Sequence, residues 1–91
     1  MSTANELPRP DDVDNAKRAV ELARIWLVDS HQQVVLSPRM WKDPAAWGLM
    51  LADLALHVAN AYEREGYDKT DVLERIYEAF DVERRSPTDT P

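Results

Sequence analysis

The longest stretch of regularly spaced apolar positions extends from Asp43 to Gly66 and predicts one long helix. At about 100° per residue, its apolar side chains form a broad face and, roughly opposite the centre of that face, a second strip. The broad face comprises Trp47, Met50, Leu51, Leu54, Ala55, Val58, Ala61 and Tyr62, and the second strip comprises Leu49, Ala52, Leu56 and Ala59. A helix that is apolar on two sides is expected to be buried on two sides.

The second strip predicts a contact beyond the helix's own core face. Leu49 and Leu56 are seven positions apart with alanines between them, a spacing that suits close packing against another helix. A second copy of the chain is the simplest partner for this strip. The alternative is that the N-terminal segment or a hairpin of the same chain covers it.

The start of the long helix is marked by local signals. Asp43 can accept hydrogen bonds from first-turn amides, and Pro44 suits the first helical position because no N–H is needed there. Trp41, just before the cap, is expected to fold onto the first turn near Trp47, in a loose form of the hydrophobic staple.

A second helix is predicted immediately after the first. Gly66 can adopt the left-handed conformation that ends a helix, which would place Tyr67 against Tyr62. Asp68 then caps a helix that extends to about Arg84. The apolar stripe of this second helix comprises Leu73, Ile76, Tyr77 and Phe80. The link is so short that the two helices must fold back as an antiparallel pair.

Two runs of β-branched and aromatic residues precede the long helix and predict an antiparallel hairpin. The first extends from about Leu22 to Asp29 and the second from Gln33 to Ser37. The polar link, which includes His31, has no glycine or asparagine, so a loop of three to five residues is expected rather than a tight type I′ turn. The predicted fold class is therefore α+β: an N-terminal antiparallel β-hairpin packed against an antiparallel pair of helices, with flexible termini.

The remaining segments define the predicted domain organisation. Residues 1–14 are expected to form a flexible N-terminal arm that Leu7 can pin to the body, residues 15–85 a single α+β domain, and residues 86–91 a disordered tail. The apolar spacing between Asn15 and Ala23 is helical, which leaves open whether residues 15–22 form a helical turn or belong to the strand.

Side-chain alternation along the first strand singles out Trp26. Ala23, Ile25 and Leu27 share one face, which is the better core face, whereas Arg24 and Trp26 share the other. Trp26 is therefore expected either to point outward as part of a contact surface or to be covered by the N-terminal arm.

Composition excludes several classes of function. A net charge of −6 argues against a general nucleic-acid binder and against an anionic membrane surface as partner. The absence of cysteine removes disulfides, thiolate chemistry and Cys-based metal sites. The N-terminus has no apolar core like that of a secretory signal, and the longest apolar segment carries polar residues, so neither a signal nor a membrane span is expected. A cytoplasmic protein without a cofactor is the default interpretation.

The best candidate for a ligand site is a polar stripe on the long helix. It comprises Asp53, His57, Asn60 and Arg64 at i, i+4, i+7 and i+11, with Trp47 as a possible wall. The Asp53 carboxylate can reach the imidazole one turn away and tune it as a base, and Arg64 can hold a carboxylate or phosphate. The alternative without a ligand is a solvated or interface face whose side chains form i, i+4 hydrogen bonds with one another. No catalytic residue is predicted, because no nucleophile and no oxyanion donors are evident. No metal site is predicted, because His31 and His57 lie in different elements.

The order of several motifs resembles a known family. Arg24 and Trp26, a short hairpin, and the stretch D-P-A-A-W-G that begins at Asp43 are similar to a family of short bacterial proteins, mostly alphaproteobacterial, known as domain of unknown function 5076. The similarity extends from about Ala19 to Gly66 and implies no activity, because the family has none assigned.

Two hypotheses of function follow. The first is a small interaction or regulatory protein acting as a homodimer through Leu49, Leu56 and Trp26 or through the outer edge of the hairpin, where two copies can join into a four-stranded sheet. The second is a small-ligand-binding or enzymatic protein built on the Asp53/His57/Arg64 stripe. An accessory subunit for another protein remains a third possibility.

Overall fold

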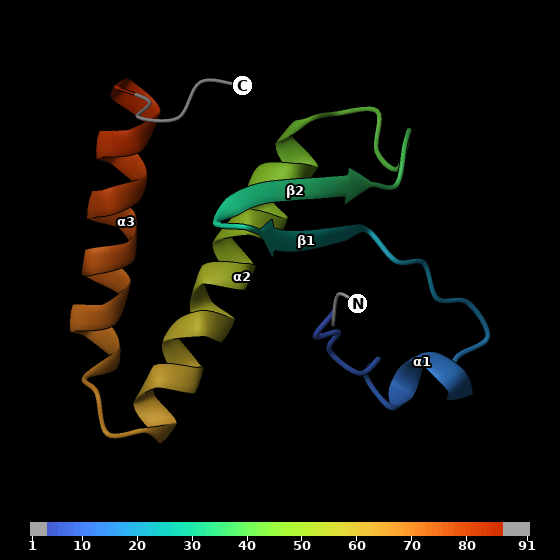
Figure 1. Ribbon diagram of the computed structural model, residues 1–91, viewed down its shortest axis with the longest axis horizontal. Helices are drawn as coiled ribbons and strands as arrows, with labels where there is room; N and C mark the ends of the chain where they lie inside the picture. The colour runs from blue at the N-terminus through green and yellow to red at the C-terminus, as the bar shows by residue number, and fades with distance from the viewer. Residues whose placement is uncertain (1–3, 87–91) are drawn as a thin grey trace. The chain divides into compact units, whose positions relative to one another are not determined.

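The computed structural model describes residues 4–86 and has an α+β architecture, as the sequence predicts. A short helix α1 (Asp12–Asn15) precedes strands β1 (Ala23–Val28) and β2 (His31–Leu36), which are followed by the long helices α2 (Ala45–Arg64) and α3 (Lys69–Arg85), as Figure 1 shows. The chain divides into two compact units, residues 1–40 with the hairpin and residues 41–91 with the helix pair. Each unit is described by itself.

The strands form the predicted antiparallel hairpin, but the predicted loop length is wrong. Val28 pairs with His31, so only Asp29 and Ser30 connect the strands, with φ of 49° and 70°. These values are those of a type I′ turn, whose twist matches that of the paired strands. Aspartate tolerates the left-handed region, and the pairing of six residues on each strand outweighs the cost at serine. His31 is consequently the first residue of β2 and does not belong to the turn.

The face of the hairpin that was predicted to be buried is exposed to solvent. The register places Ala23, Ile25 and Leu27 on one face together with Gln32, Val34 and Leu36. This apolar face is open, with Ile25 and Leu27 61% and 78% exposed. Trp26, on the other face, is half-buried. Both expectations for Trp26, an outward contact surface and cover by the N-terminal arm, stay predictions.

Of residues 15–22, Asn15 ends the helical turn α1 and the others belong to neither a helix nor a strand. After α1, residues 16–22 have no regular structure, which answers the question left open for residues 15–22. Leu7 does not pin the N-terminal segment, because its side chain is 87% exposed. One charged pair connects the segment to β1 instead, because Glu6 Oε2 lies 2.9 Å from Arg24 Nη1. Within the segment, Arg9 Nη2 lies 3.0 Å from Asp14 Oδ1.

The flexible arm and the disordered tail stay predictions. Within the predicted arm at residues 1–14, residues 1–3 lie outside the described part of the chain, and so does the predicted tail after Ser86. The remainder of the predicted arm is held by the ion pairs and contains most of α1.

The start of α2 follows the predicted signals. The Asp43 carboxylate accepts a hydrogen bond from the Ala45 amide at 3.0 Å. Pro44 was predicted at the first helical position and lies one residue before it, at the cap. The rings of Trp41 and Trp47 meet edge to face, with centroids 5.0 Å apart. The predicted cap and the predicted aromatic contact are thus both confirmed.

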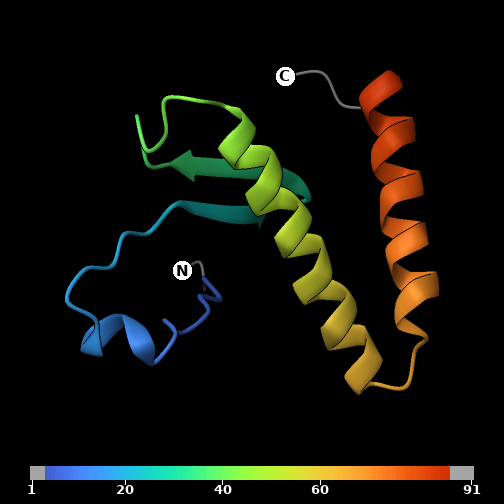
Figure 2. The ribbon, with the colours of Figure 1, turned by 180° about the vertical axis from the view of Figure 1, so that it is seen from behind.

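The turn between α2 and α3 also follows its predicted pattern. Gly66 has φ of 100°, and the Tyr67 amide donates to the Tyr62 carbonyl at 3.2 Å, which is the backbone bond of a Schellman ending. The Tyr62 and Tyr67 rings pack edge to face at 5.3 Å. The short connection folds α3 back antiparallel to α2 (Figures 1 and 2).

The cap of α3 supports a first prediction. The Asp68 carboxylate accepts from the Asp71 amide at 3.0 Å. Asp68→Ala removes this acceptor and is expected to lower the free energy of unfolding by about 1 kcal/mol. Urea denaturation measures the change, with Thr70→Ala, at an exposed position of the same turn, as the control. Equal effects of the two substitutions would contradict a role for the cap.

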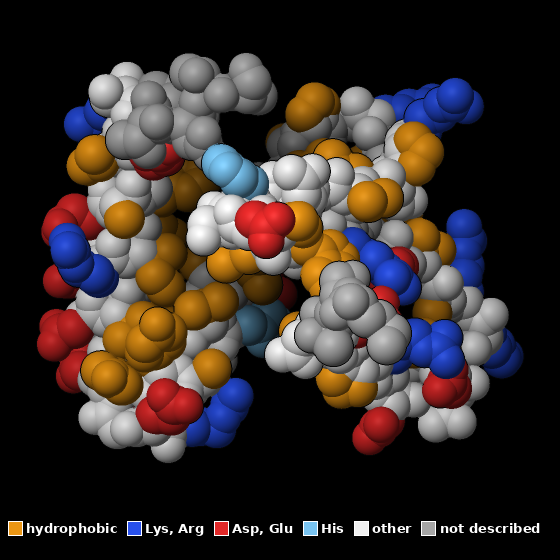
Figure 3. Space-filling view, in the orientation of Figure 1, with side chains coloured by type: hydrophobic (Ala, Val, Ile, Leu, Met, Phe, Trp, Pro, Cys, Tyr) orange, Lys and Arg blue, Asp and Glu red, His pale blue; other side chains and the backbone are white. Residues whose placement is uncertain are grey.

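Little of the apolar surface is enclosed. Ala59 of α2 is fully enclosed, and it is the only side chain of the described residues that is. In the apolar stripe of α3, Leu73 and Ile76 are half-buried, whereas Tyr77 and Phe80 remain exposed. Figure 3 shows hydrophobic side chains open at the surface of α3. The helix unit therefore keeps apolar surface that two helices cannot cover.

Candidate functional site

The predicted polar stripe lies on α2 as one continuous row. Asp53 Oδ2 and His57 Nε2 are 3.3 Å apart, and both side chains are largely exposed. Asn60 is half-buried, and Arg64 is exposed at the end of the helix. The predicted contact between the carboxylate and the imidazole is therefore present, and the other two residues follow it along the same side.

This row can orient an imidazole but does not enclose a ligand. The Asp53 carboxylate is near enough to the His57 ring to orient it. The predicted wall is absent from the row, because Trp47 lies about 120° round the helix from Asp53. Trp47 instead contacts Trp41. The role of the row in binding a ligand stays a prediction.

The described part of the chain, residues 4–86, offers neither a metal site nor a membrane span. That range contains no group of three or more His, Cys, Asp or Glu side chains placed to hold a metal ion. Neither α2 nor any other helix in the same range is both long enough and apolar enough to cross a membrane.

The predicted interface residues of α2 differ in exposure along their strip. Leu49 is 75% exposed and Leu56 is 39% exposed, whereas Ala59, on the same strip, is enclosed. The strip is thus covered at its C-terminal end within the chain and open toward its N-terminal end. Leu49, nearly three helical turns before the enclosed Ala59, has space beside it for another apolar surface.

The outer edge of the hairpin is a predicted contact surface, but the sequence does not predict the groove along it. A groove of about 1270 Å³ extends along β1, lined by residues 4–10, by Glu21 and by residues 23–29. Residues 4–10 lie on the side of β1 away from β2 (Figures 1 and 2). This β1 edge groove includes Trp26, the third predicted interface residue. In the sequence, the opposite charges of Glu6 and Arg24 are the feature that could have indicated this groove. These residues are too far apart along the chain for a periodic pattern to pair them.

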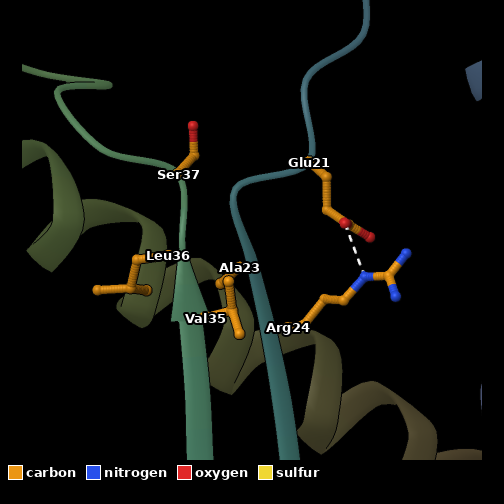
Figure 4. A pocket seen from close by; sticks show the side chains of 6 residues that line it. All are labelled: Glu21, Ala23, Arg24, Val35, Leu36 and Ser37. Atoms are coloured by element: carbon orange, nitrogen blue, oxygen red, sulfur yellow. Dashed lines mark hydrogen bonds and ion pairs between the residues drawn. The ribbon is translucent and has the colours of Figure 1, made fainter.

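Arg24 is the charged centre of this region. Its Nε donates to Glu21 at 2.8 Å and its Nη1 to Glu6 at 2.9 Å. The hydrogen bond that Arg24 donates to Glu21, with the charges of Glu21 and Glu6, raises the pKa of Arg24 above its usual value. Figure 4 shows the Arg24 side chain directed toward Glu21, beside a shallow depression of about 280 Å³ that Val35, Leu36 and Ser37 also line.

Comparison with protein families identifies the chain's relatives. The family model for a domain of unknown function, DUF5076, matches residues 6–88. The chain belongs to this family. The match extends well beyond the stretch from Ala19 to Gly66 that carries the sequence resemblance, and it includes the hairpin and both long helices of this DUF5076 member.

A solved structure has the same fold. It comes from the photosynthetic bacterium Rhodopseudomonas palustrus and is provisionally named a pyruvate dehydrogenase. It is 37% identical in sequence, with a TM-score of 0.76, and the match covers 100% of this chain and 94% of the other. The name describes that protein. None of the curated proteins matches this chain.

Proposed function

We propose that this protein is a small bacterial, cytoplasmic interaction or regulatory protein that acts as a homodimer. The observation that supports the proposal is the exposure of large apolar side chains. On α2 and α3 they are Leu49, Leu51, Leu54, Leu56, Val58, Tyr62, Tyr77, Phe80 and Val82, while in residues 4–86 only Ala59 is fully enclosed. Apolar patches of this extent on a small chain mark association surfaces.

A second copy suits this surface for a physical reason. Burying one leucine fully contributes about 1.5–3 kcal/mol, so a few of these side chains provide much of the stability that a 91-residue chain lacks alone. In a two-fold dimer the same patch serves both partners. Such a patch must pack favourably against a copy of itself. The strip of Leu49 and Leu56 can do so, because apolar side chains pack well against other apolar side chains.

The first test is the mass in solution across a micromolar dilution series. Light scattering is expected to give twice the chain mass of 10.4 kDa. A folded monomer at every concentration would overturn the homodimer.

Charge substitutions then locate the helix contact. Leu49→Glu and Leu56→Glu, made singly, are expected to weaken the dimer at least tenfold and to lower its thermal stability, because each places a carboxylate in an apolar contact. Thr70→Glu is the matched control, since it adds the same charge at an exposed position of α3. If both leucine variants keep the mass and the stability of the parent, the strip is not an interface.

The ligand-binding alternative rests on the contact between Asp53 and His57. It expects inorganic phosphate or acetate to shift the NMR signals of His57 and Arg64 together, with saturation. Asp53→Asn, which keeps the shape and removes the charge, is the variant for comparison. Unchanged signals at millimolar anion would remove this alternative.

A further inference from the structure

The free edge of β1 presents unpaired backbone groups in a regular row. The Ser37 amide donates to the Leu22 carbonyl at 2.9 Å, and Val28 pairs with His31 next to the turn. In an antiparallel pair the residues that exchange hydrogen bonds alternate along the strand. Even-numbered residues of β1 therefore direct their N–H and C=O groups toward β2. Ala23, Ile25 and Leu27 direct theirs away from it.

Nothing in residues 4–86 forms a backbone ladder with this row. The backbone hydrogen bonds outside the helices and strands include none between residues 4–10 and β1. Pro8 and Pro10 have no N–H to offer, so the N-terminal segment is a poor ladder partner. The β1 edge groove keeps the segment beside the strand and leaves open space along every residue of β1.

We propose that β1 of a second copy enters this groove and pairs antiparallel with β1 about a two-fold axis at Ile25. The product is a four-stranded sheet in the order β2-β1-β1-β2. This inference rests on the proposed homodimer and specifies where the two copies join. Free strand edges commonly associate in this way unless they are blocked.

The register follows from the row of outward backbone groups. With the axis at Ile25, Ala23 pairs with the partner's Leu27, and Ile25 pairs with the partner's Ile25, so all three outward residues exchange hydrogen bonds. A shift of the axis to Arg24 or to Trp26 leaves one of the three outside the ladder. The shift to Arg24 also sets two like charges directly opposite each other, which is unfavourable.

The side chains are complementary in this register. On one face the apolar row of Ala23, Ile25 and Leu27 is continued by the same row of the partner. On the other face Arg24 is opposite the partner's Trp26, in a pair without hydrogen bonds, where side chains approach most closely. A guanidinium over an indole is a favourable contact. Glu21 and Glu6 bind the edges of the Arg24 guanidinium, which leaves its flat face free to stack.

The free edge of β2 does not match itself equally well. Its outward residues are Gln32, Val34 and Leu36. An axis at Val34 sets Gln32 opposite the partner's Leu36 and Gln33 opposite the partner's Val35, so polar side chains meet apolar ones on both faces. The observations therefore favour the β1 edge.

Single cysteines test the register directly, because the chain has none of its own. Ile25→Cys places two thiols opposite each other at the axis, at about 5.5 Å between Cα atoms, within the range of a disulfide. Leu27→Cys, on the same strand and face, places its two copies about 14 Å apart, which no disulfide can bridge. Oxidation with copper phenanthroline is expected to give at least tenfold more covalent dimer for Ile25→Cys than for Leu27→Cys.

A mixture provides a second, independent readout. Ala23→Cys and Leu27→Cys mixed in equal amounts are expected to form a mixed disulfide, although neither cross-links with itself. This readout remains decisive if Ile25→Cys does not fold. Val34→Cys is the control for the other edge and is expected to stay uncross-linked.

The outcomes separate this inference from the proposed function. If light scattering shows a dimer but neither Ile25→Cys nor the mixture cross-links, the β1 pairing is overturned and the homodimer stands. Cross-linking of Val34→Cys in place of Ile25→Cys also overturns the pairing. A folded monomer at every concentration overturns both.

Discussion

Ala59→Phe is expected to lower the free energy of unfolding by about 3 kcal/mol, at the upper end of the usual cost of overpacking. Ala59 has no exposed surface in the folded chain. A phenyl ring at this position must displace the atoms that enclose it or push the helix aside. Urea denaturation followed by circular dichroism measures the change.

The matched control for Ala59→Phe is Ala61→Phe on the same helix. Ala61 is exposed and lies about 200° further round α2, so the same ring points to solvent there. A surface substitution of this kind is expected to change the free energy of unfolding by less than about 0.5 kcal/mol. Equal costs at the two positions would show that helix propensity, and not enclosure, determines the effect.

The helix boundaries could be predicted because their signals are local. Asp43 caps the amide two residues on, and Asp68 caps the amide three residues on. Gly66 adopts the positive φ that residues with a Cβ avoid. Each of these features depends on neighbours within one or two helical turns, so the sequence alone contains the necessary information.

The hairpin turn could not be predicted because the local preferences of its two residues are overridden by the pairing of the strands. Asp29 and Ser30 lack the glycine or asparagine that usually marks a type I′ turn, yet both have positive φ. The ladder begins with Ala23 opposite Leu36 and ends with Val28 opposite His31, so it depends on the whole length of both strands. The favourable free energy of that pairing determines the two-residue turn. The residue preferences at two positions do not contain this information.

The candidate surfaces were predicted unequally. The Asp53–His57 contact follows from helical spacing alone, so its geometry could be predicted, whereas its role could not. The β1 edge groove is lined by residues 4–10, a segment at least thirteen residues before β1. Charge pairing between Glu6 and Arg24 places that segment, and the apolar Leu7 stays in solvent. The β1 edge groove follows from this non-local contact, which a periodic pattern does not encode.

Ile25→Pro is expected to weaken the homodimer while it leaves the hairpin folded. The Ile25 N–H points to the free edge, so proline there removes no bond of the β1–β2 ladder. In the proposed pairing Ile25 meets its own copy, and two intermolecular hydrogen bonds are lost at once. At about 0.5–1.5 kcal/mol each, this loss corresponds to a roughly 5- to 150-fold increase in the dissociation constant.

Val34→Pro is the matched control, because it makes the same chemical change at the free edge of β2. Its N–H also points away from the ladder, so the hairpin is expected to persist, and the dimer is expected to keep the parent's dissociation constant. Light scattering over a dilution series gives the dissociation constants, and cross-strand amide NMR contacts report the hairpin. A weaker dimer for Val34→Pro alone would move the junction to β2. An unchanged dimer in both variants would transfer the whole contact to the apolar strip of α2, since neither strand edge would then contribute.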